Sequence, residues 1–142
     1  MTHIINSLDE ISHHYDALFV DLWGCVHNGI VAYTAAVEAL IEYRKNGGKV
    51  VLVTNSPKPR IGVEKQLLHF NVPKICYDTV ATSGDSARVA MFTGVVGKKI
   101  FFIGEPRDQL FFEPISIIKS PIKIEQVSIQ NAEGIVCTGP FD

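Results

Sequence analysis

The sequence contains few cysteines and no long hydrophobic run. Its three cysteines, Cys25, Cys76 and Cys137, lie far apart and form no C-x-x-C pair. This number and spacing predict neither a disulfide framework nor a zinc site, and a reducing environment is the default expectation. The apolar runs, such as 17–20 and 50–53, are much shorter than the roughly 18 residues that a transmembrane helix needs. We therefore predict a cytoplasmic protein that does not span a membrane.

Charge of either sign is also modest. The 142 residues include 13 Lys+Arg and 15 Asp+Glu, which gives a formal net charge of −2. Because no basic stripe or run of like charges is present, no electrostatic binding to nucleic acid or to an anionic membrane is expected. The glycine-rich phosphate-binding patterns G-x-G-x-x-G and G-x-x-x-x-G-K-[ST] are both missing. Hydrophobic residues make up 46% of the chain, which predicts one globular domain with a core of its own.

Short apolar runs alternate with segments of helical character along the chain. The two clearest runs, 17–22 and 49–54, are almost continuously apolar, which predicts strands buried on both faces of a parallel sheet. Residues 105–128 are interrupted by prolines and are predicted to be irregular. The remaining predicted strands cover 78–82, 98–103 and 133–137, and the predicted helices cover 35–46, 57–70 and 83–92. This order predicts an α/β fold with right-handed crossover connections.

Turn and capping residues mark a flap and the starts of the helices. Asn28-Gly29 lies between two short apolar arms, which is a strong hairpin signal and predicts a β-hairpin flap directly after the first strand. Thr34 is expected to cap the helix that follows the flap. Ser56-Pro57 combines a capping residue with a proline at the first helical position, which predicts that the next helix begins at residue 57.

Polar residues end the first two predicted strands. Asp21 ends the first strand, and Thr54 and Asn55 end the second. Ligands of open parallel sheets bind at the carboxyl ends of the strands, so a carboxylate and a hydroxyl are expected to share one site. The helix expected from Pro57 would turn its N-terminus toward the same place and favour a bound anion. A carboxylate, an anion site and a flap together predict phosphoryl transfer through an aspartyl intermediate.

These residues resemble the motifs of the haloacid dehalogenase (HAD) superfamily. The segment 21–29, D-L-W-G-C-V-H-N-G, resembles the first motif, in which a strand-end Asp is followed two residues later by a second Asp. The segment 51–56, V-L-V-T-N-S, resembles the second motif. Its T-N-S form is typical of subclass IIA, which includes NagD-like and pyridoxal-phosphate phosphatase-like proteins. The segments 81–85, 99–104 and 135–139 resemble later parts of the same branch, so the resemblance covers about residues 15–142.

The resemblance implies a fold and a role for individual residues. It implies a HAD-like Rossmannoid parallel sheet over 15–142, preceded by an N-terminal arm or helix over 1–14. Asp21 would be the nucleophile and a Mg²⁺ ligand, and the backbone carbonyl of Trp23 would be a second ligand. Thr54 would hydrogen-bond the transferred phosphoryl group, with support from the amide of Asn55. The implied substrate is a small phosphorylated metabolite, and Mg²⁺ suits oxygen ligands of this kind.

Three features depart from the family pattern. Trp23 replaces the second Asp, and an indole N–H is a donor that cannot act as a general acid–base. The Lys and the acidic pair that complete the metal site of the family are expected beyond residue 142. The cap domain that selects the substrate would begin at about the same point. We therefore expect an incomplete core, whose uncovered last strand favours self-association.

Three functions stay open at this stage. The first is a HAD hydrolase that acts on a phosphorylated metabolite. The second is a catalytically inactive module that keeps the fold for binding or interaction, for which Trp23 would be a sign of lost activity. The third is a metal-independent, dehalogenase-like hydrolase, because an aromatic residue can stand at this position in dehalogenases. A response-regulator receiver fits poorly, since its phosphoacceptor Asp ends the third strand.

Overall fold

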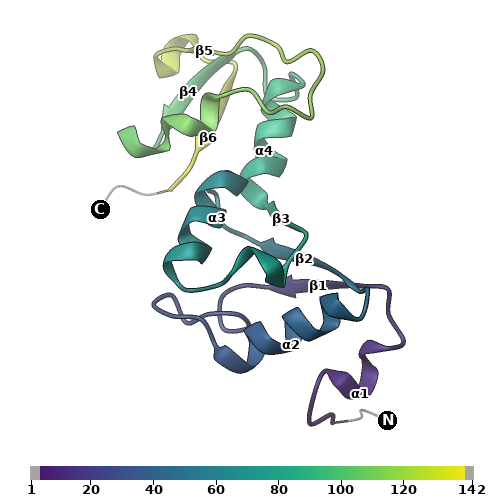
Figure 1. Cartoon of the computed structure of the whole chain (residues 1–142). Helices are drawn as coiled ribbons and strands as arrows, with labels where there is room; N and C mark the ends of the chain where they lie inside the picture. The colour runs from purple at the N-terminus through teal and green to yellow at the C-terminus, as the bar shows by residue number, and fades with distance from the viewer. Residues whose placement is uncertain (1–3, 140–142) are drawn as a thin grey trace. The chain divides into compact units, whose positions relative to one another are not determined.

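The computed structural model describes residues 4–139, which form two compact units (Figure 1). The first unit contains the chain up to residue 54 together with 62–81, and the second contains 55–61 and the chain from 82 onward. Each unit has its own three-stranded sheet, with strand orders β1-β2-β3 and β5-β4-β6. The predicted α/β class is confirmed, but the strands are divided between two sheets.

The first unit is built on β1 (Ala17–Asp21) and β2 (Lys49–Thr54), which pair in parallel from Ala17 beside Lys49 to Asp21 beside Val53. The third strand of this sheet, β3 (Thr79–Thr82), pairs with the other side of β2. The other elements are α1 (Asp9–Ser12), α2 (Thr34–Lys45), α3 (Arg60–His69) and the 3₁₀ turn η1 (Lys74–Cys76). The one-turn helix α1 lies inside the segment predicted as an N-terminal arm or helix.

The hydrophobic core of the first unit lies on one face of its sheet. The strands contribute alternate residues to this core, including Val50, Leu52 and Val80. Both α2 and α3 pack into the same cluster, which shows that they cover the same face; their buried members are Leu40, Tyr43, Val63 and Leu67.

The other face of this sheet is exposed. Phe19 is 78% exposed and Val53 is 39% exposed. The prediction that the first two strands are buried on both faces is therefore wrong. The physical reason is that α2 and α3 both lie on the opposite face, and within the described part of this unit no helix covers Phe19.

An ion pair between Arg44 and Asp78 and a hydrogen bond of Tyr43 fasten α2 to its neighbours, and Asp78 also binds β2. Arg44 donates to Asp78 through Nε at 3.2 Å and Nη2 at 2.9 Å, and the Val50 N–H donates to Asp78 Oδ2 at 2.8 Å. The hydrogen bond from Val50 and those from Arg44 hold the pKa of Asp78 below its usual value, because they favour the charged carboxylate. The Tyr43 hydroxyl donates to the Tyr15 carbonyl at 2.7 Å.

The second unit has a smaller core beneath a short parallel sheet. In this sheet β4 (Lys99–Ile103) pairs in parallel with β5 (Glu125–Gln126) and β6 (Gly134–Cys137). The helical elements are α4 (Ser83–Phe92) and the 3₁₀ helices η2 (Pro106–Phe112) and η3 (Ile129–Asn131). Arg88 is buried and donates to the Phe111 carbonyl at 2.9 Å and to Asp85 at 2.8 Å. The segment predicted as irregular therefore contains η2 and β5.

Two helix starts differ from the prediction. α2 begins at Thr34 itself, and no side chain caps it from Tyr33, so Thr34 is not the capping residue. α3 begins at Arg60, three residues later than predicted, because Ser56 Oγ accepts from the Lys58 N–H at 3.2 Å in a local turn. The first N–H of α3, that of Arg60, donates to the Asp85 carboxylate at 3.0 Å. A carboxylate of α4 thus occupies the helix start that was expected to favour an external anion.

The start of α4 agrees with the prediction. Thr82 accepts a hydrogen bond from the Asp85 N–H at 2.9 Å and caps the helix.

Among the described helices, none has both the length and the apolar character needed to cross a membrane.

Candidate active site

The structure places Asp21 and Thr54 at adjacent strand ends. Asp21 is the last residue of β1 and lies beside Val53 of β2, so that Thr54 is the next residue along β2. Asp21 is exposed, and its Oδ1 accepts a hydrogen bond from the Leu22 N–H at 2.8 Å. Thr54 is half-buried, and Asn55, which directly follows β2, is exposed. An exposed carboxylate at the end of a parallel strand is in the position where open sheets bind ligands.

The loop after β1 is held by single bridges and lacks the continuous ladder of the predicted hairpin. Trp23 bridges to His27, and His27 bridges to Ala32. Gly24 and Gly29 take φ values of +79° and +87°, which L side chains rarely adopt and which turn the chain sharply at two points. These two turns leave too few extended residues for a ladder, so the flap is a compact loop.

The indole of Trp23 lies on the surface of this loop. It is 68% exposed, and its ring meets the ring of His27 edge-on, with centroids 6.0 Å apart and an interplanar angle of 86°. A Cβ atom at Gly29 would lie 2.3 Å from two atoms of the indole, so the ring rests directly on this glycine. Two backbone hydrogen bonds flank Trp23: the His27 N–H donates to the Leu22 carbonyl at 3.1 Å, and the Gly24 N–H donates to the His27 carbonyl at 2.9 Å. The backbone is therefore fixed on both sides of the Trp23 carbonyl.

His27 organises the loop and was not assigned a role from the sequence. It is 5% exposed, its Nδ1 accepts from the Gly29 N–H at 3.0 Å, and its ring contacts Phe70 at a centroid distance of 4.8 Å. Burial lowers the pKa of His27, and the negative charge of Asp21 partly offsets this shift. The burial of His27 depends on packing by distant segments. In the sequence, the only signal of its role was its position beside the Asn-Gly turn.

The oxygen donors of this site suit a hard divalent cation. A carboxylate from Asp21 and a backbone carbonyl from Trp23 are ligand types that Mg²⁺ accepts, and Mg²⁺ often keeps several waters and uses only one or two carboxylates. Within residues 4–139 there is no group of three or more His, Cys, Asp or Glu side chains that could hold a metal ion. The described residues therefore fit one part of a Mg²⁺ coordination sphere.

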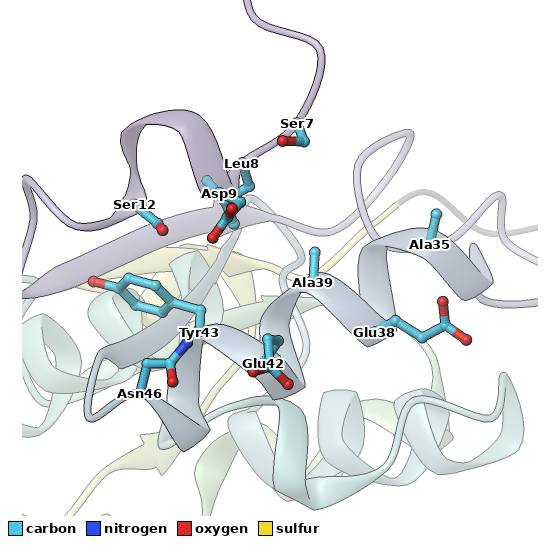
Figure 2. Close-up of a pocket in the computed structure, with 10 residues that line it drawn as sticks. All are labelled: Ser7, Leu8, Asp9, Ser12, Ala35, Glu38, Ala39, Glu42, Tyr43 and Asn46. Atoms are coloured by element: carbon cyan, nitrogen blue, oxygen red, sulfur yellow. The ribbon is translucent and has the colours of Figure 1, made fainter.

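A pocket of about 370 Å³ lies beside α2, and none of the predicted site residues lines it (Figure 2). Carboxylates of Asp9, Glu38 and Glu42 contribute to its lining, together with Tyr43 and Asn46. Their negative charge opposes the binding of a phosphate. A neighbouring pocket of about 720 Å³ shares Asp9, Ser12, Tyr43 and Asn46 with it and is also lined by the acidic residues Glu10 and Asp16. Neither pocket is therefore a candidate for the phosphate site.

Comparisons with known proteins identify the family. A family model described as haloacid dehalogenase-like hydrolase matches residues 18–115. A hydrolase of the haloacid dehalogenase-like family from Brucella suis 1330 is 38% identical, with a TM-score of 0.86 over 98% of this chain and 48% of that chain. The comparison with curated proteins gives no match.

A second solved structure shows the fold alone. A glycerol phosphate phosphatase from Mycobacterium tuberculosis, in complex with calcium, is 24% identical, with a TM-score of 0.54 over 71% of this chain and 29% of that chain. The present chain thus spans about half the length of the Brucella protein and less than a third of the Mycobacterium protein.

The matched range contains the candidate site. It begins at Leu18 in β1 and includes Asp21, Trp23 and Thr54. It also extends over well more than half of the chain. The chain belongs to the haloacid dehalogenase-like hydrolase family.

Proposed function

We propose that this chain carries the nucleophile part of a hydrolase that cleaves a small phosphorylated metabolite through an aspartyl-phosphate intermediate. The observation that carries the proposal is the position of Asp21 and Thr54 at adjacent strand ends inside the range of the family match. The T-N-S form of the second motif supports a subclass IIA member. The name of the Mycobacterium neighbour, a glycerol phosphate phosphatase, supports a phosphate ester as the substrate.

Asp21 is the nucleophile in this proposal. The Leu22 N–H holds Oδ1, and Oδ2 attacks the phosphorus atom of the ester. A P–O bond forms to Asp21 while the ester P–O bond breaks, and the departing alkoxide takes a proton from water. A second water then hydrolyses the acyl phosphate, which releases inorganic phosphate and restores the carboxylate. The Thr54 hydroxyl orients the phosphoryl group by donating to one of its oxygens.

The Asp21 carboxylate and the Trp23 carbonyl are the residues that would hold Mg²⁺. When bound, Mg²⁺ supplies positive charge that offsets the charge of the phosphoryl oxygens. Calcium, which is bound in the Mycobacterium structure, is another hard cation that takes oxygen ligands.

Trp23 sets the expected rate. The family pattern places an Asp here that exchanges protons with the leaving group, and an indole cannot do this. General acid–base catalysis typically contributes about 10²–10⁴-fold, so turnover is expected to be slower by that factor than in a relative with the second Asp.

The proposal includes a cytoplasmic location and self-association. Cys25, Cys76 and Cys137 are free thiols, which suits a reducing compartment. Cell fractionation tests the location. Light scattering after size-exclusion chromatography tests self-association. We expect a molar mass that exceeds that of one chain and increases with protein concentration.

The test is the hydrolysis of p-nitrophenyl phosphate with and without Mg²⁺. We expect Mg²⁺-dependent turnover that is lost in Asp21→Asn. Asp16→Asn is the matched control, because Asp16 is exposed and just precedes β1, and only its backbone carbonyl makes a bond, to the Lys49 N–H. If the wild-type chain turns over the substrate no faster than Asp21→Asn, the chain is not the proposed catalyst, and the hypothesis of a binding module is favoured. If the chain instead releases halide from a 2-haloacid without metal, and Asp21→Asn abolishes this release, the hypothesis of a dehalogenase-like hydrolase is favoured.

A further inference from the structure

The tryptophan that stands in place of a general acid constrains the leaving group of the proposed reaction. When Asp21 attacks the phosphorus atom, the ester oxygen departs with the electron pair of the broken P–O bond. A phenol such as the tyrosine side chain has a pKa of about 10, whereas water, which aliphatic alcohols resemble, has a pKa of about 15.7. A phenolate can therefore depart without a proton far more readily than an alkoxide can. A site that has Trp23 where an acid is expected favours esters with a weakly basic leaving group.

His27, which packs against the indole, does not replace this acid. Its Nδ1 accepts a hydrogen bond from the Gly29 N–H at 3.0 Å, so the ring proton lies on Nε2. Burial lowers the pKa of His27, which keeps the ring neutral at neutral pH. A neutral imidazole gives up its remaining proton far less readily than an imidazolium does. The departing oxygen therefore receives no proton from His27.

The loop after β1 presents an apolar surface near the nucleophile. Trp23 is 68% exposed and Ile30 is 79% exposed, and the indole rests on Gly29, the neighbour of Ile30. The charge of Asp21 acts on the ring of His27, whose centroid lies 6.0 Å from that of Trp23. The carboxylate and the indole thus belong to one local cluster. An exposed indole in this position can stack on a planar ring of a bound ester.

We propose that the hydrolase acts on phosphate monoesters of phenols, and that the Trp23 indole stacks on the departing ring. This inference rests on the proposed function and narrows its substrate class. The bond from Asp21 to phosphorus forms while the bond from phosphorus to the ring oxygen breaks. The aryloxide leaves with the electron pair and then takes a proton from water. Hydrolysis of the acyl phosphate follows and is the same for every ester.

Three phosphate monoesters separate the acidity of the leaving group from its shape. Phenyl phosphate has an aromatic ring and a weakly basic leaving group, benzyl phosphate has the ring but departs as an alkoxide, and cyclohexyl phosphate has neither property. In Mg²⁺ we expect kcat/KM for phenyl phosphate to exceed that for benzyl phosphate at least about 10²-fold, the smallest typical contribution of a general acid. Benzyl phosphate should exceed cyclohexyl phosphate about two- to tenfold, the contribution of an aromatic pair. We compare kcat/KM because kcat also includes the later hydrolysis of the acyl phosphate.

Variants of Trp23 keep its backbone carbonyl and change the two properties separately. Trp23→Asp should raise kcat/KM for benzyl phosphate about 10²–10⁴-fold and reduce the preference for phenyl phosphate. Trp23→Leu should remove the preference for benzyl over cyclohexyl phosphate, and Trp23→Phe should retain it. Cys25→Ser is the matched control, because Cys25 is exposed in the same loop, and it should leave all three kcat/KM values unchanged. The circular dichroism of every variant should equal that of the wild type.

Binding gives a readout that does not depend on turnover. Trp23 is the single tryptophan, so its fluorescence reports directly on the proposed stacking. In Asp21→Asn, phenyl phosphate should quench this fluorescence saturably, with a Kd about two- to tenfold lower than that of cyclohexyl phosphate.

The possible failures are distinguishable. If the wild type hydrolyses phenyl and benzyl phosphate with equal kcat/KM, the inference is overturned while the phosphatase stands. A loss of benzyl phosphate hydrolysis in Cys25→Ser would overturn it too, since that thiol would then be the acid. If no ester is hydrolysed faster than by Asp21→Asn, the proposed function itself fails. An equal Kd for phenyl and cyclohexyl phosphate would refute the aromatic contact whether or not turnover is observed.

Discussion

Truncation of Leu52 and of Phe19 to alanine gives a sharp test of which sheet face is covered. The two residues lie in neighbouring strands of one sheet, β2 and β1. Leu52 is fully buried at 0% exposure, whereas Phe19 is 78% exposed. By size alone the phenylalanine should be the more costly loss, because truncation of a buried Phe costs about 3–5 kcal/mol and that of a buried Leu about 2–5 kcal/mol.

The structure reverses this order. Leu52→Ala opens a cavity in the core and is expected to lower the free energy of unfolding by about 2–5 kcal/mol. Full burial of a Phe side chain contributes about 1.5–3 kcal/mol, and only about a fifth of Phe19 is buried. Phe19→Ala should therefore cost no more than about 0.7 kcal/mol from lost burial.

Urea denaturation of both variants measures the difference. Trp23 is the single tryptophan and lies in the first unit, so its fluorescence reports on the unit that contains both substitutions. Far-UV circular dichroism provides a second probe, and the m values should agree with that of the wild type. If Phe19→Ala destabilises the chain as much as Leu52→Ala, the sheet face that carries Phe19 is covered in the free protein and the reasoning fails.

Three further predictions concern the loop after β1. Trp23→Asp should raise the kcat for p-nitrophenyl phosphate about 10²–10⁴-fold in Mg²⁺, because it supplies the missing general acid–base, and an unchanged kcat in a folded variant would refute this role. Gly29→Ala should lower the free energy of unfolding by about 1–2 kcal/mol, since φ is +87° and the new Cβ would displace the indole of Trp23. Thermal unfolding measures this loss. Gly139→Ala is the control, because a Cβ at Gly139 would meet no atom within 4 Å. The pKa of His27 is lowered from 6.5 by burial, so the folded state binds fewer protons than the unfolded state, and stability should be full above pH 6.5 and fall as the pH decreases below it. Urea titrations at pH 7.5 and 5.5 should show a smaller loss in His27→Gln, and an equal loss in the two proteins would contradict this account.

Local patterns predicted most of the element order. The apolar run at 49–54 and the segment at 83–92 became β2 and α4 at the predicted boundaries. These elements depend on side-chain periodicity and on caps such as Thr82, which are local properties. The boundary of α3 was missed for two reasons. Ser56 forms a local turn with Lys58, and the first N–H of α3 is capped by Asp85, a residue 25 positions away that periodicity cannot reveal.

The candidate site was likewise predicted only in part. The adjacency of Asp21 and Thr54 follows from two strands that end in polar residues and pair in parallel. The flap was predicted as a hairpin from Asn28-Gly29, but the structure forms isolated bridges there. The burial of His27 against Phe70 joins residues that are distant in the sequence, and no local signal specifies it.

Three features of this protein can be predicted from the amino-acid sequence: the alternation of strands and helices, the polar residues at the strand ends and the motifs of the family. Each of these follows from neighbouring side chains, whose period and capping chemistry are readable in one dimension. Which face of each strand is covered depends instead on packing between segments that are distant in the sequence. A continuous apolar run such as 17–20 is compatible with burial on one face or on both, and the choice depends on where the connecting helices pack. In the first unit α2 and α3 share one face, so Leu18 packs against the core while Phe19, its neighbour in the chain, is left exposed.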